Sequence, residues 1–155
     1  MADETKVAEE IQLVIFSLGR EEFAVEVTQV REIMRMEEIT RMPKSPPFVE
    51  GIINLRGQII AVIDLAKRLN LETSERDGET RIIVVEAEDI KVGMIVGSVS
   101  EVLRVSSGAV ESSPTLAADV SAAYLQGVVK QDNRLIILLD LTKVLSLEEI
   151  ARIGF

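Results

Sequence analysis

The chain has 155 residues, enough for one ordinary domain or two very small ones; 47% are hydrophobic and only 3% aromatic, so any core must consist of Val, Ile, Leu and Ala. Its net charge of −9 argues against binding to nucleic acid or to an anionic membrane surface, because both recruit proteins through Lys and Arg. The absence of Cys and His excludes disulfides and thiolate metal sites and removes the commonest general base, so we expect no metal and no cofactor.

The N-terminal segment and the apolar stretches set the expected location. Residues 1–10 are acidic and lack the basic-then-apolar layout of a secretion signal, so we expect a flexible N-terminus. Even the longest purely aliphatic stretches, such as Leu135–Leu139, are far shorter than the roughly 20 residues that a membrane-spanning helix needs. We therefore expect a cytoplasmic protein without direct membrane insertion.

In the first half, apolar runs flank two tight turns. We expect hairpins formed by Gln12–Leu18 with Glu22–Val27 and by Val49–Leu55 with Gln58–Asp64. Gly57 in the second turn can supply the positive φ that a tight turn requires. Between the hairpins we expect a helical piece at Thr28–Met34, while the three prolines of Arg41–Pro47 exclude a central strand. A short helical turn is expected after Asp64.

The second half repeats this layout after a polar link at Thr73–Thr80. We expect hairpins formed by Arg81–Val85 with Ile90–Val96 and by Tyr124–Lys130 with Arg134–Leu139. Between them, Ser106–Ser121 is expected to be a long surface loop. A helical turn should follow Asp140, and another helical piece is expected at Leu147–Ile153.

An internal repeat explains this similarity. Phe48–Leu69 aligns with Tyr124–Leu145 at an offset of 76 without a gap, and six of the 22 positions are identical. Val14–Arg35 aligns with Ile83–Arg104 at an offset of 69. Matched pairs are Gly51/Gly127, Asp64/Asp140, Val30/Val99, Glu32/Glu101 and Arg35/Arg104. The order of the blocks is preserved, which indicates duplication of one unit of about 65–75 residues.

The short strands and short connections favour a mainly β protein built from two small closed barrels. We assign residues 11–76 to the first subdomain and residues 80–150 to the second. Units this small are marginal alone, so we expect them to share an apolar interface, with a groove where they join. Whether the terminal strands stay in their own barrel or cross to the other is left open.

Two carboxylates and three glycines stand out as candidate site residues. Asp64 and Asp140 resemble a catalytic pair, but each ends a strand and opens the pattern Asp-Leu-x-Lys-x-Leu, which favours capping of a helical turn. Duplication also places them in separate units, which disfavours a shared catalytic site. Gly51, Gly57 and Gly127 are interpreted as backbone-geometry residues. We therefore expect no enzyme.

A second group of candidates can serve either packing or binding. Arg56 lies at a hairpin tip, where the other unit has Asp132, so it is either a solvated turn residue or a bidentate contact for a partner carboxylate. Val30 and Ile33 align with Val99 and Val102, and duplicated apolar residues of this kind usually belong to a core. The residues alone leave both alternatives open.

The run FVEGIINLRGQIIAVIDL at Phe48–Leu65, preceded by Met42-Pro43 and Pro46-Pro47, resembles the CheW-like family of bacterial chemotaxis coupling proteins. The similarity continues through Phe23–Met34, Val92–Leu103 and Tyr124–Val144 and covers nearly the whole chain. Ala61 departs from the family, which often has proline in this strand.

The resemblance implies two tandem five-stranded SH3-like β-barrels with a few short helices. It implies a non-enzymatic adaptor that binds the cytoplasmic tip of methyl-accepting chemotaxis receptors and the regulatory domain of the histidine kinase CheA. The receptor-binding positions carried over are Val30, Glu32, Ile33, Arg56 and Val102, lining the groove between the barrels. Alternatives are a regulatory or adaptor module of a larger kinase or receiver-fusion protein, and a small carboxylate-dependent barrel enzyme.

Overall fold

The computed structural model describes residues 9–73, 75–112, 122–145 and 150, and its strands form two sheets. The six-stranded sheet has the order β8-β1-β2-β11-β10-β9, with β1 Glu10–Leu18, β2 Glu21–Glu26, β8 Ser98–Ser106, β9 Val110–Glu111, β10 Leu125–Gln131 and β11 Arg134–Leu139. The five-stranded sheet has the order β3-β6-β7-β5-β4, with β3 Val30–Arg35, β4 Val49–Leu55, β5 Gln58–Asp64, β6 Arg81–Ala87 and β7 Ile90–Val96. The mainly β class is confirmed.

The helices that lie wholly within the described ranges are short and sit at the strand ends. Helices α1 (Leu65–Arg68) and α2 (Leu141–Leu145) follow β5 and β11, as the positions of Asp64 and Asp140 predict. Three 3-10 turns, η2 (Val27–Gln29), η3 (Ser107–Ala109) and η5 (Ala122–Tyr124), each lead into a strand.

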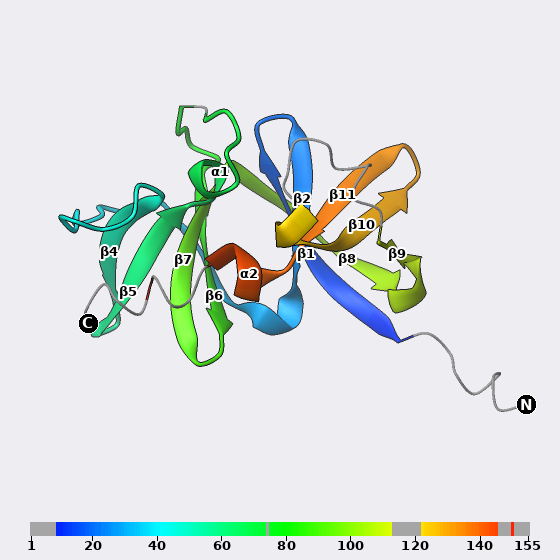
Figure 1. The fold of residues 1–155 in the computed structure, drawn as a ribbon, viewed down its shortest axis with the longest axis horizontal. Coiled ribbons are helices and arrows are strands. Elements are labelled where there is room, and N and C mark those ends of the chain that lie inside the picture. Colours follow the sequence, from blue (N-terminus) through cyan, green and yellow to red (C-terminus); the bar gives the residue numbers. More distant parts are fainter. Residues whose placement is uncertain (1–8, 74, 113–121, 146–149, 151–155) are drawn as a thin grey trace, which may run out of the picture.

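The two repeat units exchange their first hairpins. β1 and β2 from the first unit pair with β8 and β11 from the second, while β6 and β7 from the second unit pair with β3 and β5 from the first. Figure 1 shows the blue β1–β2 hairpin beside orange β10 and β11, and the green β6–β7 hairpin beside β4 and β5. Each sheet therefore contains strands of both units, and the limits 11–76 and 80–150 describe the sequence repeat rather than the sheets.

Strand alternation produces three apolar clusters. On β1, Val14 and Phe16 face a core that also contains Ile63 and Met94 of the other sheet, and we call this cluster the shared core. The alternate residues Leu13 and Ile15 face a second cluster, made by the six-stranded sheet alone. A third cluster belongs to the five-stranded sheet alone. Because successive side chains point to opposite faces, one aliphatic strand serves two cores, and the sheets are joined by buried apolar surface.

Two expectations are corrected. The predicted helix at Thr28–Met34 is wrong, because only Val27–Gln29 is a 3-10 turn and Val30–Arg35 is strand β3. The end strands of each sheet do not pair with each other within the described ranges, so the barrels are not closed. The proline-containing segment after β3 forms no ladder with β4, since proline cannot donate to one; an isolated bridge pairs Thr40 with Ile52, and the Pro46 carbonyl accepts from the Val49 N–H.

Some expectations fall partly or wholly on residues outside the described ranges. The predicted helix Leu147–Ile153 lies outside them except for Ile150, as do residues 113–121 of the predicted loop Ser106–Ser121. The first residues of that loop form η3 and β9, and β9 pairs with β10. The proline-containing stretch Arg41–Pro47 contains no strand, as predicted.

Candidate functional site

An ion pair joins the two ends of the five-stranded sheet. Arg56, at the β4–β5 turn, donates from Nη1 to Glu32 Oε2 at 3.0 Å and from Nη2 to Glu32 Oε1 at 2.5 Å. Glu32 lies on β3 and the turn follows β4, and these are the edge strands of the sheet. The hydrogen bond from Arg56 lowers the pKa of Glu32, because it stabilises the ionised carboxylate. The Arg56 side chain remains 73% exposed, so its other donors can reach a partner.

The Arg56 turn is held by local geometry. Arg56 has a φ of 51° and Gly57 a φ of 85°, as in the type of turn that joins tightly paired strands. The Gly57 backbone N–H donates to Asn54 Oδ1 at 2.8 Å. The guanidinium is therefore presented from a defined hairpin tip.

A β-bulge places Val30 and Ile33 on one face of β3. Val30 is opposite Val85 and Ile33 opposite Ile83, with the register shifting between Val30 and Glu32. Val85 and Ile83 both belong to the shared core, and directly opposite residues point to the same face. Val30 packs against that core, whereas Ile33 lies further along the edge strand and is 41% exposed.

Strand β8 repeats this arrangement on the other sheet. Val99 is opposite Phe16 and Val102 opposite Val14, again with a register shift, so both valines face the shared core. Val99 packs against it, whereas Val102 is 57% exposed. Ile33 and Val102 are thus exposed apolar residues on the edge strands of two different sheets, each on the face that its sheet turns toward the other. That they line one groove stays a prediction.

The second unit has a similar ion pair, but its arginine comes from a position that is not equivalent to Arg56 in the repeat. Arg134 pairs with Glu101, the repeat equivalent of Glu32, at 2.9 Å, and also donates to both oxygens of Glu22 at 2.9 Å. These hydrogen bonds raise the pKa of Arg134 further above its ordinary value. The sequence comparison missed this pair because it aligned Arg56 with Asp132, two residues before Arg134. An Arg at either end of the aligned turn, opposite a matched Glu, is the signal that could have found it.

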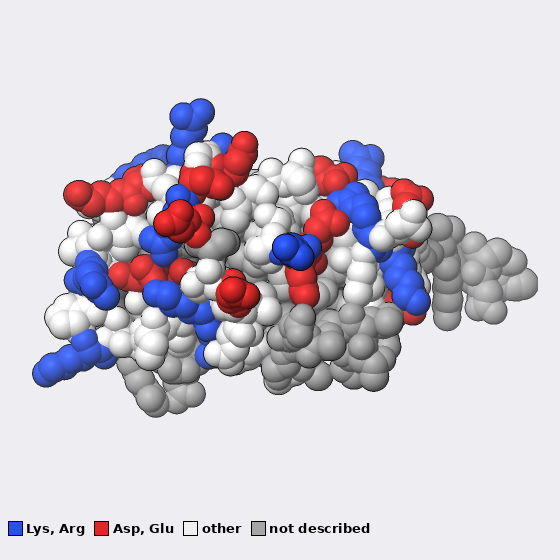
Figure 2. Space-filling model, turned by 90° about the horizontal axis from the view of Figure 1, so that it is seen from above, with Lys and Arg blue, Asp and Glu red and all other residues white. Residues whose placement is uncertain are grey.

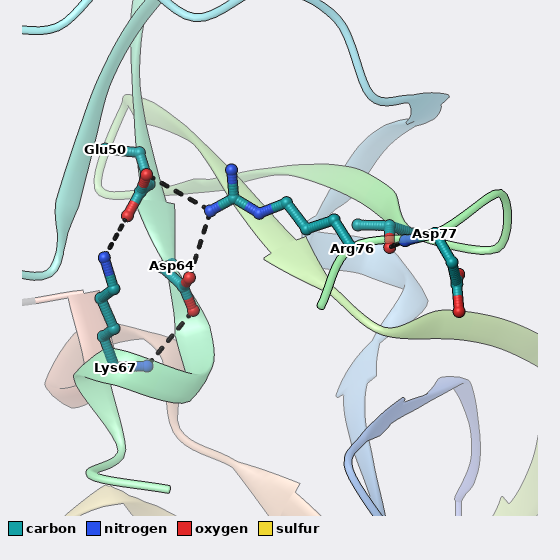
Figure 3. Close-up of polar contacts among 6 residues, drawn as sticks. Glu50, Asp64, Lys67, Arg76 and Asp77 are labelled. Atoms are coloured by element: carbon teal, nitrogen blue, oxygen red, sulfur yellow. Dashed lines mark hydrogen bonds and ion pairs between the residues drawn. The ribbon is translucent and has the colours of Figure 1, made fainter. Parts of the chain in front are cut away.

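Asp64 caps α1 and anchors the link between the units. Its Oδ1 accepts from the Lys67 backbone N–H at 3.3 Å, and its Oδ2 accepts from Arg76 Nη2 at 3.2 Å. Figure 3 shows Glu50 completing the network, with ion pairs to Lys67 at 2.7 Å and to Arg76 at 3.3 Å. Asp140 accepts from the Lys143 backbone N–H at 3.4 Å. Both carboxylates are thus engaged in capping, each beside its own sheet.

Gly51 and Gly127 allow another chain segment to approach closely. A Cβ atom on Gly51, whose φ is 152°, would lie 2.0 Å from the Thr40 carbonyl oxygen. A Cβ on Gly127 would lie 2.8 Å from the Glu111 carbonyl oxygen. Thr40 bridges to β4 and Glu111 pairs with β10, so both units use the glycine for the same purpose.

The surface has mixed charge. Figure 2 shows acidic and basic side chains interspersed over the face at the top of Figure 1, with uncharged surface between the two halves. In the described ranges, no group of three or more His, Cys, Asp or Glu is placed to hold a metal ion. Nor does the described part of the chain contain a helix of the length and apolarity needed to cross a bilayer.

Comparison with known proteins gives consistent matches. The model of the CheW-like domain matches residues 12–149. The chain is 39% identical to the chemotaxis protein CheW of Bacillus subtilis, with 96% of this chain and 94% of that protein covered, and 35% identical to CheW of Treponema pallidum, with 94% and 88% covered. The crystal structure of the scaffolding protein TtCheW from Thermoanaerobacter tengcongensis superposes with a TM-score of 0.80 at 37% identity, covering 86% of each chain. The chain therefore belongs to the CheW family of chemotaxis scaffold and adaptor proteins, which are not enzymes.

Proposed function

We propose that this protein is a cytoplasmic adaptor that binds the tips of methyl-accepting chemotaxis receptors and the regulatory domain of the kinase CheA, and so couples the two within receptor arrays at the inner membrane. The observation that carries the proposal is the exposure of Ile33 and Val102 on two different edge strands, with the exposed Arg56 paired to Glu32 beside one of them.

The proposed receptor site is an aliphatic patch with one oriented cation. Apolar contacts from Val30, Ile33 and Val102 suit a helical segment that presents an apolar stripe. Arg56 has five N–H donors, two of which bond Glu32, so further donors can bond a carboxylate on that helix. Because the chain has no Trp and one Tyr, the site lacks the usual aromatic anchors. Moderate affinity is expected, with assembly depending on many contacts in an array.

For the kinase, we propose the ends of the two sheets as docking regions. In the five-stranded sheet, Met34, Met36, Ile39 and Leu55 are partly buried against the sheet's own cluster. Flexible thioethers suit an adaptable protein contact. This region is formed by a different face of β3 from the one that carries Ile33, so receptor and kinase can be bound together.

The test is the charge reversal Arg56→Glu. It should leave the fold intact, because the side chain is mostly exposed, and it should sharply weaken receptor pull-down while sparing binding of the CheA regulatory domain. Arg20→Glu is the matched control, since Arg20 is an exposed arginine in the β1–β2 turn of the other sheet. If Arg56→Glu binds receptor fragments as well as the wild type, the site assignment is wrong.

A double variant separates direct contact from a structural role. Glu32→Arg combined with Arg56→Glu restores an ion pair of opposite polarity between the same two positions. If the pair acts only by holding the edge strands together, the double variant should recover receptor binding. If Arg56 contacts the receptor, as proposed, binding should stay weak.

A further inference from the structure

Arg68 joins the two sheets at one point. It lies at the end of α1, which follows β5, and its guanidinium carbon is 4.6 Å from the centroid of the Phe48 ring and 5.1 Å from that of Tyr124. Its Nε–H donates to the Val144 carbonyl oxygen at 2.5 Å. Phe48 directly precedes β4 of the five-stranded sheet, whereas Tyr124 and Val144 flank β10 and β11 of the six-stranded sheet.

The partners of Arg68 are related by the internal repeat. Phe48 and Tyr124 are equivalent positions at the offset of 76, and so are Arg68 and Val144. The contact therefore forms where equivalent corners of the two units meet. Only the first unit has the guanidinium, so a single side chain occupies this point and contacts both halves.

Arg68 supplies a directional contact that the shared core lacks. Apolar burial is non-directional, so the hydrophobic effect alone does not define one angle between the sheets. A planar guanidinium beside two rings, with a hydrogen bond along Nε, requires all three partners in defined places. The core holds the sheets together, and the contacts of Arg68 add a directional constraint between them.

We infer that Arg68 is a positioning residue that fixes the angle between the two sheets and thereby transmits the receptor's state to the kinase. The relay rests on the function proposed above, since Ile33 and Val102 lie on different sheets and a change of angle changes their separation. The positioning role itself rests only on the contacts of Arg68.

The experiment measures the angle directly and the coupling separately. Because the chain has no Cys, spin labels can be attached at Arg35→Cys on β3 and Lys130→Cys on β10, both exposed and on different sheets. In Arg68→Met, which keeps an unbranched side chain but loses the cation and donor, we expect a broader, shifted distance distribution, with displaced arrangements enriched roughly tenfold. Lys67→Met is the matched control, because Lys67 is the neighbouring cation and its ion pair with Glu50 stays within one sheet.

Functional readouts distinguish relay from folding. Arg68→Met should bind receptor tips alone and the kinase domain alone nearly as well as Lys67→Met does, while receptor control of kinase activity is lost. If Arg68→Met fails to fold, Arg68→Lys serves instead, since it keeps the charge but lacks the planar group and Nε–H. The same broadening is expected.

An unchanged distance distribution in a folded Arg68 variant would overturn the positioning role. Broadening with intact receptor control of the kinase would overturn the relay. If the unsubstituted protein binds neither receptor nor kinase, the proposed function fails instead, and the label distances in the free protein still decide what Arg68 does.

Discussion

Removing the carboxylate of Asp64 should destabilise the protein more than removing that of its repeat equivalent, Asp140. Both accept a hydrogen bond from a backbone N–H in the following helical turn, at 3.3 Å and 3.4 Å. These distances are long, so each cap is placed in the lower part of the usual range, about 0.5–1 kcal/mol. The two sites differ in their second contact.

That second contact determines the expected difference. Asp64 also bonds Arg76, and its side chain is only 12% exposed, whereas Asp140 has a 4.0 Å ion pair with Lys143 and is 31% exposed. A well-exposed pair contributes little, but a half-buried one contributes about 0.5–1 kcal/mol. We therefore expect Asp64→Ala to lower the free energy of unfolding by about 1–2 kcal/mol and Asp140→Ala by about 0.5–1 kcal/mol.

Urea unfolding of both variants and of the wild type measures this difference, provided that the slope with denaturant is unchanged. The stability of Asp64→Asn should lie between that of the wild type and that of Asp64→Ala. Asn caps helices about as well as Asp, but it lacks the charge that Arg76 contacts. An equal or larger cost at Asp140 would refute the assignment of the extra stability to Arg76.

Two further predictions concern close packing and acid. Gly51→Ala should lower the free energy of unfolding, measured in urea, by about 3 kcal/mol, because the new methyl group collides with the Thr40 carbonyl. Gly78 has open space around it, so the control Gly78→Ala should change stability by less than about 0.5 kcal/mol. Equal effects of the two substitutions would contradict the close approach at Gly51. Burial raises the pKa of Glu50, but Lys67 and Arg76 together outweigh it, so the pKa is lowered in the folded state. Its stabilising contribution should be fully present above the unfolded pKa of about 4.3 and be lost as pH falls through the lower folded value. Glu50→Gln should therefore lose less stability than the wild type between pH 7 and pH 3. An equal decrease in the free energy of unfolding of the two proteins over this range would contradict the prediction.

The hairpins could be predicted from sequence because their signals are local. Val49–Leu55 and Gln58–Asp64 were expected at the limits that β4 and β5 have, since two apolar runs flank a Gly-containing turn. Strand β3 was mistaken for a helix for a physical reason. Its bulge puts Val30 and Ile33, three residues apart, on one face, which is the spacing that a helix would give.

The hairpin exchange depends on contacts that a repeat alignment does not contain. Aligning the two units shows which segments are equivalent, but an equivalent segment can pair within its own unit or with the other one. The choice is made by the parallel pairs β5–β7 and β2–β11, which join residues far apart in sequence. The central residues of these strands are apolar and buried on both faces, so they carry no register signal for one partner over the other.

The repeat alignment also fails to show which arginine pairs with the matched glutamate in each unit. Glu32 and Glu101 are matched in the repeat, and each forms an ion pair with an arginine. That arginine lies at the hairpin tip in one unit and is the first residue of β11 in the other. Arg56 is 73% exposed and bonds one glutamate, whereas Arg134 is 33% exposed and is held by two. The duplication therefore keeps an ion pair at the edge of each sheet but leaves an accessible guanidinium at only one. A receptor contact that needs free N–H donors should accordingly depend on Arg56 and be far less sensitive to Arg134, which makes the two arginines of this near-symmetric fold functionally unequal.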